Sequence, residues 1–158
     1  MSATPYENDS NLTIAETYYS SMLKRDFNMM SSYLHENVHF IGPLTEMRGR
    51  DAVVSAAKNL SAILNDIQIR AKFSVGNQIM FAYDFMFPAP IGCLRAAVLM
   101  EFTNQLISKI ELFYDGRPFE EKKDEILANF PQLKAHDEKI GNIPKIAEWR
   151  KNRPVTEF

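Results

Sequence analysis

The sequence has little of several features that mark particular protein classes. It has one cysteine, Cys93, so no disulfide can form within the chain. Its longest unbroken apolar runs, such as residues 96–100, are far shorter than the roughly 20 residues of a membrane-spanning helix, and no apolar stretch follows a basic start. These absences lead us to expect a cytoplasmic, reduced protein that has no membrane partner.

Neither sign of charge dominates, and several motifs of nucleotide and acyl chemistry are absent. Lys and Arg number 18 against 20 Asp and Glu, which gives a net charge of −2, so nothing favours nucleic acid as a partner. There is no phosphate-cradling glycine loop and no nucleophile elbow, which argues against P-loop enzymes and serine hydrolases. His35 and His39 flank the junction of a helix and a strand, and His136 is distant, so we expect no metal and no cofactor.

The first part of the chain predicts helices. Residues 1–12 are polar and suggest a loose arm. Thr13 to Glu16 reads as a capping box that opens a first helix, Asp26 is placed to cap a short second one, and Gly49 precedes a third. A short strand at residues 38–41 separates the second and third helices.

The middle of the chain has the period of two that is typical of strands. We expect strands at residues 67–75, 78–87, 93–103 and 107–115, joined as an antiparallel meander. The last connection suggests that Thr103 faces Ile107, which would pair Glu101 with Lys109 and Arg95 with Asp115. The even-numbered face would then be the apolar one.

The predicted fold class is therefore α+β, with N-terminal helices packed on a curved antiparallel sheet. Helical patterns return at residues 120–129, 131–140 and 143–151. We divide the chain into an arm at 1–12, one domain at 13–121 and a helical C-terminal extension at 122–158.

Four strings in this order resemble the nuclear transport factor 2-like superfamily, with its SnoaL-like and ketosteroid isomerase-like members: HFIGPL, RGRDAV, YDFMFPAP and KIELFYDGRPFE. The resemblance implies a cone-shaped α+β barrel around a pocket for a small lipophilic molecule. It also implies a homodimer through the outer sheet face, which Leu99 and Phe113 would suit.

The resemblance to enzymes of this superfamily is incomplete. Tyr18 falls where ketosteroid isomerases have a tyrosine, but Gly42 takes the place of their carboxylate base. Epoxide hydrolases of this fold use a carboxylate relay, whose positions fall here on His39, Ile41 and Leu112. SnoaL-type cyclases rely on one strand aspartate, and Asp84 is the residue that could take that part.

Two registers are open for Asp84. If Phe87 pairs with Cys93, Asp84 faces the pocket, where poor solvation would raise its pKa and suit it to proton transfer. If the register moves by one residue, Asp84 pairs with Arg95 on the outer face as a structural ion pair. His39 could assist Asp84 from the pocket side, or could be a histidine held by ordinary hydrogen bonds.

Three functions follow as hypotheses. The first is proton transfer on a lipophilic carbonyl by Asp84, His39 and Tyr18. The second is a non-catalytic binding or dimerisation module, so whether the protein is an enzyme stays open. The third, weaker, rests on residues 130–158, whose IPKIAEW and RPVTEF strings are similar to the end of sigma-class glutathione transferases. The expected pocket lining is apolar and rich in methionine: Phe40, Met80, Met86, Val98, Met100, Leu112 and Tyr114.

Overall fold

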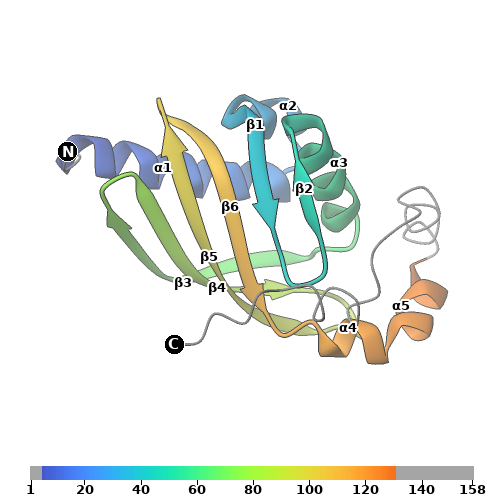
Figure 1. Cartoon of the computed structure of the whole chain (residues 1–158). Helices are drawn as coiled ribbons and strands as arrows, with labels where there is room; N and C mark the ends of the chain where they lie inside the picture. Colours follow the sequence, from blue (N-terminus) through green and yellow to red (C-terminus); the bar gives the residue numbers. More distant parts are fainter. Residues whose placement is uncertain (1–4, 131–158) are drawn as a thin grey trace, which may run out of the picture.

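The structure is a computed structural model that describes residues 5–130 (Figure 1). The helices expected beyond residue 130 lie outside this range. The helices are α1 (Pro5–Leu23), α2 (Phe27–Ser32), α3 (Arg50–Ser61), α4 (Arg117–Glu121) and α5 (Lys123–Asn129). The strands are β1 (Leu34–Ile41), β2 (Glu46–Arg48), β3 (Asp66–Val75), β4 (Gln78–Met86), β5 (Cys93–Thr103) and β6 (Leu106–Tyr114).

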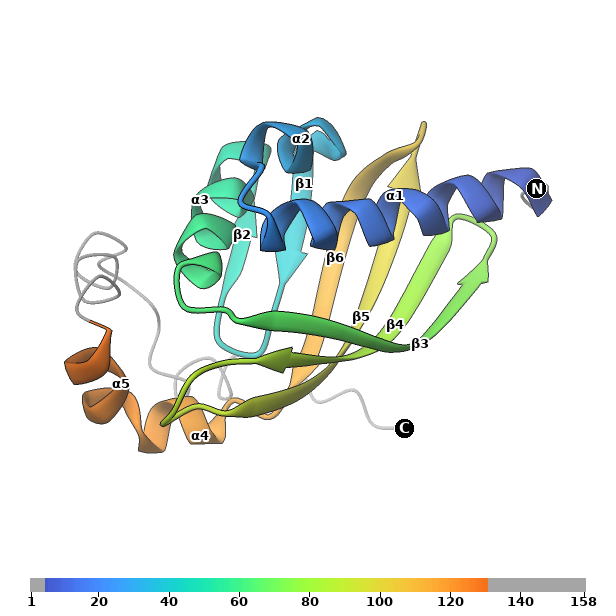
Figure 2. The same cartoon turned by 180° about the vertical axis from the view of Figure 1, so that it is seen from behind.

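The six strands form one curved sheet in the order β2-β1-β6-β5-β4-β3. The α+β prediction is confirmed, although the sheet is mixed because β1 runs parallel to β6. Helix α1 crosses the concave face and packs on β3 and β4, while α3 packs on β1 and β2 (Figure 2). The helices and the concave face thus enclose the core.

Helix α1 begins at Pro5, eight residues before the predicted cap at Thr13. The expectation of a loose arm was therefore wrong for residues 5–12. Asn11 is buried and Leu12 packs against the core, so tertiary contacts stabilise a segment whose composition alone favours disorder. Proline also suits the first position of a helix, where its missing N–H costs nothing.

The starts of the next two helices agree with the sequence. The Asp26 carboxylate accepts a hydrogen bond from the Met29 amide at 3.1 Å and caps α2. Gly49 precedes α3 with φ of +94°, a conformation that favours glycine. Strand β1 starts at Leu34 rather than at residue 38, and the three-residue strand β2 was not predicted.

The β5–β6 register agrees with the prediction along most of the hairpin. Glu101 pairs with Lys109, but a bulge follows, so the loop contains only Asn104 and Gln105, both with positive φ. The predicted ion pair between Arg95 and Asp115 is wrong. Asp115 lies beyond β6, and its carboxylate is 2.7 Å from Arg117.

The β4–β5 register is the outer-face alternative. Met86 pairs with Cys93 and Asp84 with Arg95, because the amide of Phe87 bonds to the carbonyl of Gly92 at 3.0 Å and closes the loop one residue earlier than expected. A shift of one residue turns every side chain of a strand to the other face. The odd-numbered residues of β4 therefore point into the core, and Asp84 points away from it.

A bulge at Arg70 divides strand β3. Ile69 pairs with Tyr83 on the inner face, whereas Ala71 pairs with Ala82 on the outer face. The alternation predicted over residues 67–75 thus holds for the first half of the strand only. Phe73 and Val75 are both exposed on the outer face.

Candidate ligand site

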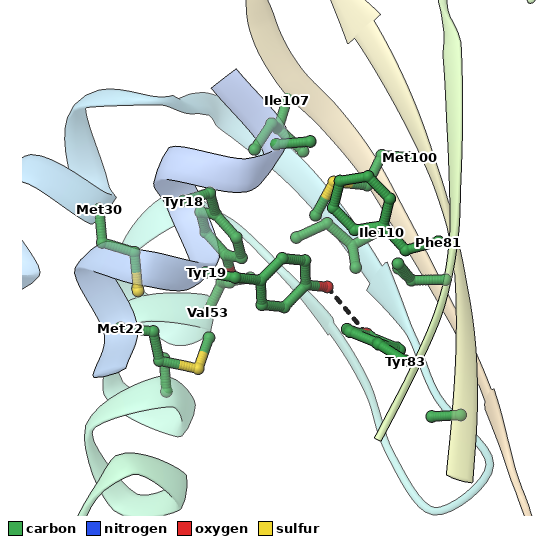
Figure 3. Packing of buried hydrophobic residues seen from close by; sticks show 14 of the residues in the cluster. Tyr18, Tyr19, Met22, Met30, Val53, Phe81, Tyr83, Met100, Ile107 and Ile110 are labelled. Carbon is green, nitrogen blue, oxygen red and sulfur yellow. Dashed lines mark hydrogen bonds between the residues drawn. The ribbon is translucent and has the colours of Figure 1, made fainter. Parts of the chain in front are cut away.

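A cavity of about 110 Å³ lies between α1, α3 and the concave face of the sheet. Its lining is almost wholly apolar, and three tyrosine rings form its wall on the α1 and β4 side (Figure 3). The lining residues are Tyr18, Tyr19, Met22, Phe40, Thr45, Met47, Val53, Ala56, Ala57, Leu60, Tyr83, Phe85, Ile110 and Leu112.

The three tyrosines carry the polar atoms of this wall. The hydroxyls of Tyr19 and Tyr83 share a hydrogen bond of 2.9 Å, in which either can donate. The rings of Tyr18 and Tyr83 each meet the Tyr19 ring edge to face, with centroids 5.1 Å apart. Such contacts fix the rings in one arrangement.

Burial keeps these phenols uncharged. It raises the pKa of Tyr18, Tyr19 and Tyr83 well above the ordinary range because the phenolate would lose its hydration. At neutral pH the cavity therefore contains neutral hydroxyl groups, which can donate or accept hydrogen bonds.

No sequence profile of a known protein family matches the chain. Among solved structures, a protein from Kribbella flavida is 21% identical with a TM-score of 0.67, over 72% of this chain and 93% of that one. An NTF2-like protein of unknown function from Cytophaga hutchinsonii is 18% identical with a TM-score of 0.60, over 67% and 90%. The chain has the nuclear transport factor 2-like fold.

The same fold is found in an enzyme. An LEH-like epoxide hydrolase from M. tuberculosis is 11% identical with a TM-score of 0.61, over 69% of this chain and 85% of that one. At these identities the similarity concerns the fold alone, because one fold hosts many activities.

One curated protein matches a short stretch of the chain. “Probable glutathione S-transferase 5” of Caenorhabditis elegans is 58% identical over 31 residues, which is 20% of this chain. The chain spans only 15% of that relative's length. The transferase-like residues noted in the sequence, 130–158, lie almost wholly outside the described residues.

Within the nuclear transport factor 2-like fold, three of the residues predicted for the site lie at the cavity. Tyr18, Phe40 and Leu112 line the cavity. Val98 and Met100 are on the inner face but are fully buried in the core and do not reach it.

Tyr114 lies nearer the end of the sheet than the cavity does. Its ring packs on Phe119 of α4 with centroids 5.9 Å apart, and it is not part of the lining. Burial raises the pKa of Tyr114 to about 12.

The prediction that Asp84 faces the pocket was wrong, as it was for Met80 and Met86. The register places all three on the outer face of β4. The Asp84 carboxylate lies 3.2 Å from Nε of Arg70 and 3.8 Å from Nε of Arg95. These arginines account for the burial of a charged residue that is only 8% exposed, so Asp84 belongs to a structural ion pair.

His39 also lies outside the cavity. It neighbours the inward-facing Phe40, so the alternation of β1 turns it outward, where its Nε2 is 2.6 Å from the Glu46 carboxylate on β2. The proposed pair of His39 and Asp84 is therefore wrong, since β1 and β4 are separated by two strands.

Sequence reasoning missed most of the lining. Tyr19 was not among the predicted site residues, and the register that turns Asp84 inward would turn its neighbour Tyr83 outward. Thr45 and Met47 belong to the unpredicted β2 region. The apolar stripe of α3 was the available signal for Val53, Ala57 and Leu60.

The lining contains no Asp, Glu, His, Lys, Arg or Cys side chain. Within residues 5–130, no three His, Cys, Asp or Glu side chains lie close enough together to hold a metal ion. No helix in the same range is long and apolar enough to cross a membrane.

Proposed function

We propose that this protein binds a small, uncharged lipophilic molecule in the tyrosine-walled cavity and does not transform it. The observation that carries the proposal is the lining itself, which combines an apolar surface with three neutral phenols and has no ionisable acid or base of ordinary pKa. Pockets of this composition are typical of ligand sites.

The size of the cavity supports a small ligand. An apolar cavity of about 150 Å³ accepts benzene, so a cavity of about 110 Å³ suits a molecule with a single ring. Larger ligands would require the surrounding side chains to move.

The hydroxyl groups favour a ligand with one hydrogen-bond acceptor. In the Tyr19–Tyr83 pair one hydroxyl donates to the other, which leaves one hydrogen without a partner in the pair. An unpaired polar group away from water costs about 1–3 kcal/mol. A carbonyl or hydroxyl oxygen on the ligand would relieve this cost.

The alternative of proton-transfer catalysis has less support. Efficient general acid–base catalysis uses a group whose pKa is near the working pH, and no such side chain lines the cavity. Asp84, the residue that suggested this chemistry, lies on the opposite face of the sheet.

A thermal-shift experiment with phenol, cyclohexanone, benzene and benzoate tests the binding function. At 100 times its dissociation constant a ligand stabilises the protein by about 2.7 kcal/mol. We expect phenol or cyclohexanone to raise the melting temperature most, benzene less, and charged benzoate not at all.

A matched pair of variants in α3 provides the control. Ala57→Leu adds a larger side chain to the cavity lining and should abolish the shift, whereas Ala52→Leu is exposed on the same helix and should retain it. If none of the four compounds shifts the wild-type protein, or if Ala57→Leu binds as well as wild type, the cavity is not the binding site.

We further propose that the protein is a homodimer that pairs through the outer face of its sheet. Exposed side chains of Phe73, Met80 and Phe113 lie there, and such apolar patches are often interaction sites. Across β3, β4 and β5, the row of Phe73, Met80 and Leu99 runs beside a row of Ala71, Ala82 and Ala97. On β6 the first row ends at Glu111 and the second at Phe113.

These two rows favour a second copy as the partner. A half-turn about an axis that runs across the strands, between the two rows, places the large row of β3 to β5 in one copy on the alanine row of the other. On β6 it places Phe113 opposite Glu111 of the second copy. The same operation brings Arg95 opposite the partner's Glu101. A two-fold interface must be complementary to itself in this way.

A further inference from the structure

The segment that closes one side of the cavity is the loop and strand at residues 42–48, here called the flap. Its loop is held at the base by a hydrogen bond from the Gly42 amide to the Thr45 carbonyl, 2.8 Å long. Strand β2 pairs only with β1, over three residues at the edge of the sheet. Thr45 and Met47 of the flap line the cavity.

The mouth of the cavity faces the flap. The lining residues on α1 and β4 are all buried. Those that retain partial exposure come from the β1–β2 region, the outer side of α3 and the end of β6, and they are Phe40, Thr45, Met47, Ala56, Leu60 and Leu112. A ligand that enters from solvent would therefore pass between the flap and α3.

Leu44, at the tip of the flap, packs against Gly116, which lies just beyond the end of strand β6. A Cβ atom built at Gly116 would lie 2.9 Å from Cδ2 of Leu44, which is closer than such atoms approach in proteins. Gly116 has φ of −83° and ψ of −8°, which any residue can adopt. Glycine at this position therefore provides space for Leu44 and no special backbone conformation.

Gly42 has the same character at the base of the flap. Its φ is not in the left-handed region, and a Cβ there would lie 3.1 Å from Cε1 of Phe40, whose ring lines the cavity. Close packing at Gly116 thus holds the flap against the junction of β6 and α4, and close packing at Gly42 holds its base against the ring of Phe40. Figure 1 shows the β1–β2 loop beside the junction of β6 and α4.

We infer that residues 42–48 are a gate to the cavity and that the contact of Leu44 with Gly116 is its latch. The inference rests on the proposed ligand-binding function and adds its regulation. The closed gate shields the apolar lining from water, and release of Leu44 frees the loop and β2 without breaking the pairing of the other strands. Leu44 and Gly116 are positioning residues, because neither lines the cavity.

The latch predicts that Leu44→Ala and Gly116→Ala have the same effect for opposite reasons. Leu44→Ala removes the side chain that packs on Gly116, and Gly116→Ala fills the space which that side chain occupies. In both, hydrogen exchange of the Gly42 amide should accelerate about tenfold, equivalent to 1.4 kcal/mol. Association and dissociation of phenol should accelerate together, with a smaller change in affinity.

The double variant distinguishes a latch from two unrelated local defects. Once Leu44→Ala has removed the seated side chain, the methyl group that Gly116→Ala introduces has nothing to displace, so the second substitution should change exchange little further. Effects that add independently would overturn the latch. Val75→Ala, at an exposed position of the β3–β4 hairpin, should leave the exchange of Gly42 unchanged.

Hydrogen exchange is measured without a ligand, so it tests the gate independently of the ligand-binding function. If Leu44→Ala accelerates exchange but phenol never binds, the latch is supported and the binding function is lost. If phenol binds and exchange in Leu44→Ala is unchanged, the gate is overturned and the binding function remains. Should Gly116→Ala not fold, Leu44→Ala, which only shortens a side chain, still decides the question.

Discussion

At the scale of single residues, Asp84 is a structural carboxylate between two arginines. Asp84→Asn removes the charge opposite Arg70 and Arg95. Because both arginines are partly or largely exposed, solvent limits the cost, and we expect a loss of about 1–3 kcal/mol in the free energy of unfolding. Urea denaturation measures this loss, while the phenol-induced thermal shift should stay as in wild type. Unchanged stability with lost binding would instead return Asp84 to the ligand site.

The buried phenols should make stability depend on alkaline pH. Burial raises the pKa of Tyr114 from 10.0 to about 12, so its contribution is complete below pH 10 and is lost as the pH rises through 12. Each such group adds about 1.4 kcal/mol per pH unit to the slope above its unfolded pKa. Urea midpoints between pH 9 and 12 should therefore fall, and Tyr114→Phe should fall less steeply. Equal slopes for the two proteins would contradict this assignment.

The sequence could predict site residues where a family resemblance or a correct register placed them. Tyr18 was indicated by its match to the tyrosine of ketosteroid isomerases and Leu112 by the even-numbered face of the β5–β6 hairpin, and both line the cavity. Tyr83 and Asp84 exchange faces with a one-residue change in register. That register depends on the hydrogen bond between Phe87 and Gly92, which the residue types near it did not reveal.

At the scale of elements, bulges account for the errors within β3 and at the end of the β5–β6 hairpin. The type of every strand from β3 to β6 could be predicted from the period of two. The bulges after Ile69 and Glu101 could not, because each inserts one residue without a change in composition. The bulge in β3 has a further effect, since it interrupts an edge strand that also carries Arg70 and Lys72. Both features hinder pairing of that edge with another strand.

Strand β2 and the first turns of α1 illustrate a second limit. Both are short or polar segments whose stability comes from neighbours distant in sequence: β2 pairs with β1, and Leu12 packs on the core. Propensity and periodicity describe a segment by itself, so they underestimated both. The cavity wall that β2 supplies was missed for this reason.

At the scale of the whole molecule, the outer face of the sheet is better suited than its edges to pair with a second copy of the chain. One edge is the three-residue strand β2, and the other is the bulged strand β3. The outer face carries exposed Phe73, Met80 and Phe113 instead. Stable protein interfaces of ordinary size bury about 1,600 Å² in total, and a face of several strands can provide such an area where a short edge cannot.

Sedimentation velocity tests this arrangement directly. We expect wild-type protein to sediment as a dimer at micromolar concentrations and Met80→Glu to sediment as a monomer, because the new carboxylate would be buried against the partner's apolar side chains. Ala52→Glu adds the same charge at an exposed position of α3, and this variant should remain dimeric.

A charge exchange tests the two-fold arrangement. Arg95→Glu should also weaken the dimer. Glu101→Arg in the same chain should restore it if the two positions face each other across the two-fold axis. A wild-type monomer, or a dimer that Met80→Glu leaves intact, would assign the exposed face to some other role.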